Sequence, residues 1–275
     1  MSDTVPATNT APVTDTVTSK DGTTIAYEKS GSGPALVLVD GALCSREMGP
    51  GRDLAKALSD RYTVYVYDRR GRGESGNTEP YSVQREVDDL AAVIAAAGGD
   101  AFVAGQSSGA ALMLEAAASG IPMKKIASYE APYIGIAPVK GVVPDHTAIL
   151  QGYIADGNVG GAVSHFMVKM VGAPAFVPLM MRLMPKVWNG LKANGTSLPN
   201  DSRVMDGFTA PTARLASITV PTLVMGGSKA KPNMKAAVQA VADAVPGSTH
   251  ITLSGQTHQV SAAALAPELA AFFVA

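Results

Sequence analysis

The chain has 275 residues, of which 47% are hydrophobic, and its formal net charge is −1 at pH 7. This length is enough for one large domain with a sizeable buried core. The nearly neutral charge gives no electrostatic reason to expect nucleic acid or a membrane as a partner. Only one cysteine, Cys44, is present, which excludes an internal disulfide framework, and we expect it to be a small buried hydrophobic residue.

Residues 1–17 are rich in Thr, Val, Pro and Ala, and they show neither a basic segment nor an apolar segment of the kind that a signal peptide needs. We therefore expect a flexible tail outside the fold. No apolar run reaches the roughly 20 residues that span a bilayer. A cytoplasmic location is the default expectation, and it agrees with the single cysteine.

Short apolar stretches alternate with helix-like stretches over the first half of the chain. Residues 35–39 (ALVLV) form a continuous apolar run, which is typical of a strand buried on both faces of a parallel sheet. In residues 82–97, Ser82 is suited to cap a helix, and apolar residues recur at helical spacing. The expected strands are 22–28, 35–39, 63–67, 101–104 and 126–129, and the expected helices are 48–59, 82–97 and 110–118.

The alternation stops in residues 131–216, where prolines are frequent and Met and Phe recur at helical spacing. We expect several short helices that form an inserted cap. The pattern resumes with strands at 221–226 and 249–253 and with helices at 234–244 and from about Pro267 to the end. The prediction is thus an α/β core, residues 18–130 and 217–275, with a mostly parallel sheet covered by helices on both faces.

One stretch contains a candidate catalytic residue, Ser107. Residues 105–109 read Gly-Gln-Ser-Ser-Gly, a G-x-S-x-G pentapeptide between an expected strand and an expected helix. In that context the pattern predicts a tight turn that exposes the hydroxyl of Ser107 at the edge of the sheet. Gly105 and Gly109 would leave room where a Cβ would collide with the neighbouring strand and helix.

Three further segments accompany this turn in a fixed order. They are DRRGRGES (68–75) after the expected strand 63–67, PTLVMGG (221–227), which contains an expected strand, and GQTH (255–258) after the expected strand 249–253. From about Gly22 to the C-terminus the chain resembles the α/β-hydrolase superfamily, and it is most similar to small bacterial esterase-like members with a cap. The resemblance implies the α/β-hydrolase fold. It also implies a catalytic triad in the chain order Ser, acid, His.

Ser107 and His258 fit the nucleophile and the general base of such a triad. The other histidines, His146, His165 and His250, are expected to have surface or structural roles. Many members have an Asp shortly after the strand that corresponds to 221–226, but the loop here, GSKAKP, contains no carboxylate. Neighbouring strands lie only about 4.8 Å apart, so a carboxylate at the end of strand 126–129 can reach the same imidazole.

We therefore predict Glu130 as the acid, with Asp201 and Asp206 as alternatives and a Ser–His dyad as a further possibility. For the oxyanion hole, the resemblance implies the backbone N–H groups of Ala42 and Ser108, with the N–H of Leu43 as the alternative to that of Ala42. Asp40 stands where the family usually has His. We expect its carboxylate to turn away from the site and pair with Arg69 or Arg70.

The cap would supply the substrate pocket, with Asp40 and Leu43 contributing from the core. The loop 68–75 is expected to be scaffolding. No clustered Cys/His set or phosphate loop is present, so we expect neither metal nor cofactor. The candidate pocket residues of the cap are Met167, Met170, Met181 and Trp188.

The sequence favours a serine hydrolase that acts on an ester, thioester or lactone of a small apolar molecule. Two alternatives stay open. One is a lyase-type enzyme that uses the same Ser and His, because the fold alone does not decide the reaction. The other is a ligand-binding protein with little turnover, which the missing carboxylate after residues 221–226 would explain. The expected partner is a small molecule, and the sequence does not indicate an oligomeric state.

Overall fold

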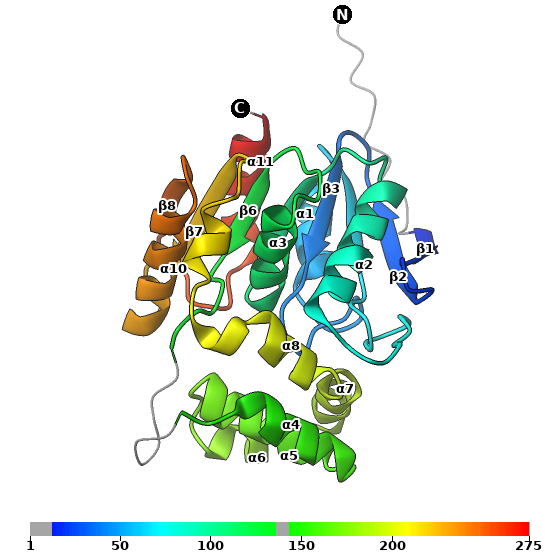
Figure 1. Ribbon diagram of the computed structural model, residues 1–275, viewed down its shortest axis with the longest axis vertical. Coiled ribbons are helices and arrows are strands. Elements are labelled where there is room, and N and C mark those ends of the chain that lie inside the picture. Colours follow the sequence, from blue (N-terminus) through cyan, green and yellow to red (C-terminus); the bar gives the residue numbers. More distant parts are fainter. Residues whose placement is uncertain (1–12, 136–142, 275) are drawn as a thin grey trace, which may run out of the picture.

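One eight-stranded sheet runs through the computed structural model, which describes residues 13–135 and 143–274 (Figure 1). The strand order is β1-β2-β4-β3-β5-β6-β7-β8. The first two strands pair antiparallel with their neighbours, and all the other pairs are parallel. The strands are β1 (Val13–Thr18), β2 (Thr24–Ser30), β3 (Ala35–Val39), β4 (Thr63–Tyr67), β5 (Phe102–Gln106), β6 (Ile126–Tyr129), β7 (Thr222–Gly227) and β8 (Thr249–Leu253).

Helices cover both faces of this sheet (Figure 1). On one face, side chains of α1 (Gly51–Leu58) and α11 (Ala262–Val274) pack with strand residues such as Leu36 and Leu223. On the other face, α2 (Val83–Ala96), α3 (Ser108–Ala118) and α10 (Pro232–Ala244) pack with Val37 and Val224. Alternate residues of each strand thus point into two different apolar layers, and the predicted mostly parallel, doubly covered sheet is confirmed.

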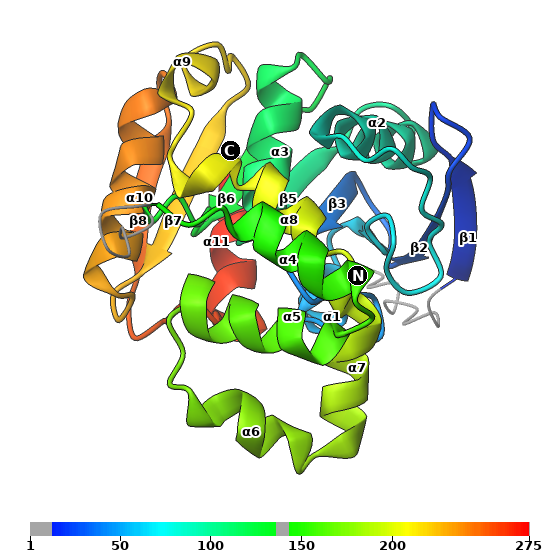
Figure 2. The same cartoon turned by 60° about the horizontal axis from the view of Figure 1, so that its bottom comes forward.

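The chain between β6 and β7 forms a set of short helices, which we call the helical insertion (residues 146–215). In Figure 1, α4 to α7 make a layer beyond the end of the sheet, and α8 lies between that layer and α3. Figure 2 shows α6 at the outer edge of this layer. The elements are α4 (His146–Ala155), α5 (Val159–His165), η1 (Phe166–Met170), α6 (Phe176–Arg182), α7 (Pro185–Gly195), α8 (Leu198–Val204), η2 (Asp206–Phe208) and α9 (Thr212–Leu215).

The starts of β1 and α11 are among the boundaries that differ from the sequence prediction. Strand β1 begins at Val13 and pairs with β2 along its whole length, so part of the expected tail belongs to the sheet; residues 1–12 lie outside the described residues. Helix α11 begins at Ala262 rather than near Pro267. The Ser261 hydroxyl accepts a hydrogen bond from the Ala264 N–H and so caps an earlier start. Pro267 then removes one hydrogen bond near the beginning of the helix without ending it.

In the described part of the chain, no helix has both the length and the apolar character that crossing a membrane requires.

Candidate active site

A strained turn carries Ser107 between β5 and α3. Its backbone has φ of 54° and ψ of −128°, a combination that residues other than glycine rarely adopt. A Cβ on Gly105 would lie 2.7 Å from the Cα of Ala110. A Cβ on Gly109 would lie 2.1 Å from the carbonyl oxygen of Val39. Only glycine fits at both positions, so the pentapeptide forms the sharp strand-to-helix turn that its spacing predicts.

His258 lies between Ser107 and Glu130. Its Nε2 is 3.0 Å from Ser107 Oγ, and its Nδ1 is 2.8 Å from Glu130 Oε2. With Nδ1–H donating to the carboxylate, Nε2 is left as an acceptor for the serine hydroxyl. The Glu130 side chain is fully buried, whereas 38% of the His258 side chain is exposed. The imidazole is therefore oriented from the protein interior and can be reached from outside.

Glu130 is held at both carboxylate oxygens. It follows β6 directly, with a φ of 47°. While Oε2 contacts His258, Oε1 accepts a hydrogen bond of 2.7 Å from the N–H of Gly227, the last residue of β7. Strands β6 and β7 are parallel neighbours, so their carboxyl ends meet at the same edge of the sheet. The orientation of the carboxylate is thus fixed from two directions.

Tyr129, which precedes Glu130, supports the loop that carries His258. Its buried hydroxyl donates a hydrogen bond of 2.6 Å to the carbonyl oxygen of Thr257. The sequence analysis missed this contact. The available signal was a tyrosine at the end of the buried strand Ile-Ala-Ser-Tyr, because a buried phenol usually needs a partner.

The loop after β3 passes close to the nucleophile. A Cβ on Gly41 would lie 2.9 Å from the Cβ of Ser107, so only glycine fits at this position. Among the turn and loop hydrogen bonds of the described residues, none runs from the N–H of Ala42 or Ser108 to a backbone carbonyl. Leu43, next along the loop, has a φ of 62°.

Comparison with known proteins gives the family. A model described as "Alpha/beta hydrolase family" matches residues 41–271, which is most of the chain. The chain belongs to the alpha/beta hydrolase family. This member of the family thus contains the turn at Ser107, a histidine, His258, after the last strand, and a carboxylate, Glu130, directly after β6.

Two solved structures and one curated relative illustrate what this chain is similar to. The alpha/beta hydrolase from Sphaerobacter thermophilus DSM 20745 is 48% identical, with a TM-score of 0.86 over 94% of this chain and 100% of that chain. The enol-lactonase from Burkholderia xenovorans LB400 is 17% identical, with a TM-score of 0.72 over 95% and 100%, and this likeness concerns the fold alone. The uncharacterized hydrolase YraK of Bacillus subtilis (strain 168) is 36% identical over 98 residues. That match spans 34% of this chain and 35% of the relative.

The two alternative acids of this alpha/beta hydrolase lie elsewhere. Asp201 is fully buried in α8, where its oxygens are bonded to Arg69, Arg72 and Ser108. Asp206 is about half exposed and pairs with Arg214 at 2.6 Å. Neither carboxylate contacts His258, so Glu130 is the acid that the structure brings to the imidazole.

The predicted pairing of Asp40 with Arg69 or Arg70 is wrong. Its carboxylate lies against the start of α1, where a Cβ on Gly51 would be 2.7 Å from Oδ2. No described residue gives Oδ2 a hydrogen bond. Burial raises the pKa of Asp40 to about 6, against the opposing effects of the Gly51 backbone and of the arginine charges nearby. The predicted partners are bonded to other carboxylates. Arg69 pairs with Glu86 and Asp201, and Arg70 pairs with Asp89 and Asp21.

A cavity of about 930 Å³ reaches Ser107 from the side of the helical insertion. Of the predicted pocket residues, Met170 lines it. Asp40 does not line it, and Leu43, Met167, Met181 and Trp188 pack instead into the apolar cluster of the insertion. Helical spacing in the sequence did not distinguish residues that line the cavity from residues that pack in the apolar cluster, because both kinds of position are apolar. The apolar lining includes Ile134, Phe166, Met170, Met205, Phe208 and Met234.

Two histidines lie in the wall of this cavity. His146 Nδ1 is 2.9 Å from His165 Nε2, so the two rings share one hydrogen bond. Burial lowers the pKa of both groups, which favours the neutral imidazoles. Three exposed lysines also border the cavity, namely Lys169, Lys229 and Lys231. In the described part of the chain, no three His, Cys, Asp or Glu side chains are grouped so that they could hold a metal ion.

Proposed function

We propose that the protein is a serine hydrolase that cleaves an ester, thioester or lactone of a small apolar substrate through an acyl-enzyme on Ser107. One observation carries the proposal. His258 lies within hydrogen-bond reach of Ser107 on one side, at 3.0 Å, and of Glu130 on the other, at 2.8 Å. A nucleophile, a base and a group that orients the base form the arrangement that activates a serine hydroxyl.

In the first half of the reaction, His258 Nε2 takes the proton of Ser107 as Oγ attacks the substrate carbonyl carbon. The carbonyl electron pair moves to the oxygen, and the N–H groups of Ala42 and Ser108 stabilise the resulting oxyanion. The tetrahedral intermediate then collapses. The bond to the leaving group breaks, and His258 gives its proton to that group. Glu130 stabilises the imidazolium while it holds the proton.

In the second half, water enters the place of the leaving group. His258 takes a proton from the water as the oxygen attacks the acyl carbon, and a second tetrahedral intermediate forms. When it collapses, Ser107 leaves with the proton that His258 returns. The product is a carboxylic acid, and Ser107 and His258 regain their starting protonation states.

The helical insertion serves as the cap that selects the substrate. The cavity volume of about 930 Å³ suits a small molecule. Its apolar wall comes mainly from the insertion, including Phe166, Met170 and Phe208. Flexible methionine side chains allow such a wall to accept acyl groups of different shape.

The test is covalent labelling of the whole protein with a fluorophosphonate, measured by intact mass. We expect the wild type to gain one adduct and Ser107→Ala to gain none. His258→Ala and Glu130→Gln should label far more slowly. If the folded wild type does not react, the serine-hydrolase proposal is wrong.

A second measurement separates hydrolysis from the two alternatives. Steady turnover of p-nitrophenyl esters of graded acyl length supports hydrolysis. A thermal shift caused by such ligands without turnover supports a binding protein. Rapid labelling of Ser107 without any turnover of these esters would favour a lyase-type reaction on the same residues.

A further inference from the structure

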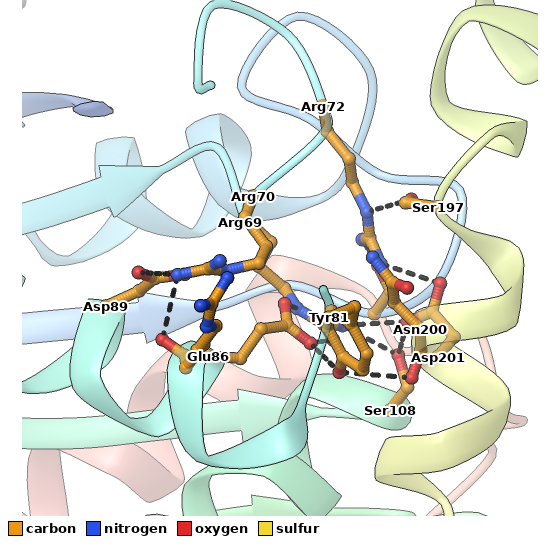
Figure 3. A network of polar contacts seen from close by, with 12 residues as sticks. Arg69, Arg70, Arg72, Tyr81, Glu86, Asp89, Ser108, Ser197, Asn200 and Asp201 are labelled. Atoms are coloured by element: carbon orange, nitrogen blue, oxygen red, sulfur yellow. Dashed lines mark hydrogen bonds and ion pairs between the residues drawn. The ribbon is translucent and has the colours of Figure 1, made fainter. Parts of the chain in front are cut away.

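A buried ion-pair network includes Ser108, the residue next to Ser107 in the sequence (Figure 3). At its centre is Asp201 of α8. Its Oδ2 accepts a hydrogen bond of 2.6 Å from Arg72 Nη2. Its Oδ1 accepts bonds from Arg69 Nη1 at 2.9 Å and from Ser108 Oγ at 2.8 Å. Asp201 comes from the helical insertion and the other three residues from the core, so the network joins the two parts.

Arg72 links Asp201 to the loop after β3. Its Nη1 donates a hydrogen bond of 2.7 Å to the carbonyl oxygen of Gly41. That carbonyl and the N–H of Ala42 belong to one planar peptide group, so holding the oxygen also fixes the direction of the N–H. A cation bonded to the carbonyl oxygen also polarises the peptide, which makes the N–H a stronger donor.

Ser108 is the second point of contact. Its side chain is bonded to Asp201 and also to Arg69, whose Nη1 lies 3.0 Å from Ser108 Oγ. The residue is fully buried. Since the Ser108 N–H is the other proposed oxyanion donor, the same carboxylate constrains both backbone segments that would bind the oxyanion.

The network is balanced in charge and shielded from water. Two arginines, Arg69 and Arg72, face two carboxylates, Asp201 and Glu86, and each of these four residues is at most 2% exposed. Burial raises the pKa of Asp201, but the charges of Arg72 and Arg69 bring it below its ordinary value. Asp201 is therefore ionised at neutral pH, and an ion pair in this setting is strongly directional.

We propose that Arg72 and Asp201 are positioning residues for the oxyanion hole: Asp201 holds Ser108 directly and holds the Gly41–Ala42 peptide through Arg72. This inference rests on the proposed hydrolase function, because it needs an oxyanion at Ser107. It also gives the helical insertion a part in catalysis besides lining the cavity, since α8 must be seated for both donors to be aligned.

The experiment compares Arg72→Lys with Arg70→Lys in the full-length protein. Arg70 lies in the same loop, is equally buried and is paired with Asp89 at 2.7 Å, but it contacts neither Gly41 nor Ser108. Lysine keeps the charge and loses the fork that contacts the Gly41 carbonyl and Asp201 together. We expect kcat of Arg72→Lys to fall about 10- to 100-fold with KM nearly unchanged, and kcat of Arg70→Lys to stay within about 2-fold.

A trifluoromethyl ketone supplies a readout that a loss of stability alone would not change. Ser107 Oγ adds to the ketone carbonyl, and the oxygen becomes an oxyanion in the hole while His258 keeps the proton. The inhibition constant of this ketone should rise by about the same factor as kcat falls, and the affinity for a carboxylic acid product should not change. Thermal melting of each variant shows that the compared proteins are folded.

Two more variants complete the test. Ser108→Ala keeps the backbone N–H and removes the side-chain anchor, so we expect about a 10-fold lower kcat. Asp201→Asn should have the largest effect because it loosens both segments. If that variant does not fold, Arg72→Lys and Ser108→Ala decide the matter. Unchanged kcat and ketone affinity in these two would overturn the inference while the hydrolase function stands, whereas a wild type without turnover or labelling would overturn both.

Discussion

Glu130 and His258 are 128 positions apart in the sequence, yet Glu130 Oε2 and His258 Nδ1 lie 2.8 Å apart. Strand β7 lies between their strands, and the residue that ends it is Gly227. A Cβ there would be 2.3 Å from the carbonyl oxygen of Gln256, so position 227 cannot carry an acid. Its N–H instead binds the second oxygen of Glu130. Glu130, at the end of β6, thus contacts His258 with one oxygen and the end of β7 with the other.

Glu130→Gln tests this arrangement. The amide cannot stabilise an imidazolium as a carboxylate does, and it can donate to Nδ1 and so favour the wrong tautomer. We expect kcat to fall about 10²- to 10⁴-fold with little change in KM. Steady-state kinetics on a p-nitrophenyl ester measures this. The control is Glu28→Gln, because Glu28 is also buried and paired, at 2.8 Å with Arg52, but it lies on β2. Equal activity of the two variants would contradict the triad.

Tyr129→Phe should lower kcat about 3- to 10-fold. It removes one buried hydrogen bond, worth about 1 kcal/mol, and leaves the Thr257 carbonyl beside His258 without that donor. The matched control is Tyr67→Phe, because Tyr67 OH is buried and has no hydrogen-bond partner among the described residues. We expect the control to keep its activity and its melting temperature. A Tyr129→Phe enzyme with wild-type kcat would show that the His258 loop needs no such support.

Asp40→Asn should change the pH dependence of stability. Burial raises the pKa of Asp40 to about 6, above its value near 4 in the unfolded chain. The native state therefore binds more protons than the unfolded state between about pH 4 and 6, and wild-type stability falls as the pH rises through that window. The penalty is absent below about pH 4 and complete above about pH 6.

The asparagine variant has no such titration. Its free energy of unfolding relative to wild type should therefore increase by about 1 to 3 kcal/mol from pH 4 to pH 7. Urea unfolding at a series of pH values measures this, and other titrating groups cancel in the difference. A constant difference over the whole range would mean that Asp40 is not perturbed by its burial.

The lysines at the cavity predict a preference among substrates. Lys169, Lys229 and Lys231 border it, and the one carboxylate among the described lining residues, Glu130, is bonded to His258 and Gly227. We expect an ester with a distal carboxylate to have a lower KM than its neutral analogue at low salt, with the difference shrinking as salt screens the charges. Lys229→Gln should reduce the preference, whereas Lys56→Gln, on α1 away from the cavity, should not. An unchanged KM ratio in Lys229→Gln would contradict the prediction.

The local sequence determined the core of this alpha/beta hydrolase. Strands at 35–39, 63–67, 126–129 and 249–253 are found as predicted. The first three are mainly apolar runs bounded by polar or glycine-rich residues, whereas 249–253 (THITL) is rich in β-branched residues, which favour strands. The turn at Ser107 was recognisable because backbone geometry within a few positions requires its glycines. The histidine after β8 was expected from the resemblance to the α/β-hydrolase superfamily, in which the base follows the last strand.

The sequence did not determine which charged groups pair or which apolar side chains face the cavity. Arg69, Arg70 and Arg72 could be seen as three cations in one loop, but their partners Glu86, Asp89 and Asp201 lie 17, 19 and 129 positions further on. Met170 and Met181 were both candidate pocket residues in the sequence, but only Met170 lines the cavity. Ion pairing and cavity shape depend on distances between segments remote in sequence, and only the packing of the insertion against the sheet decides those distances.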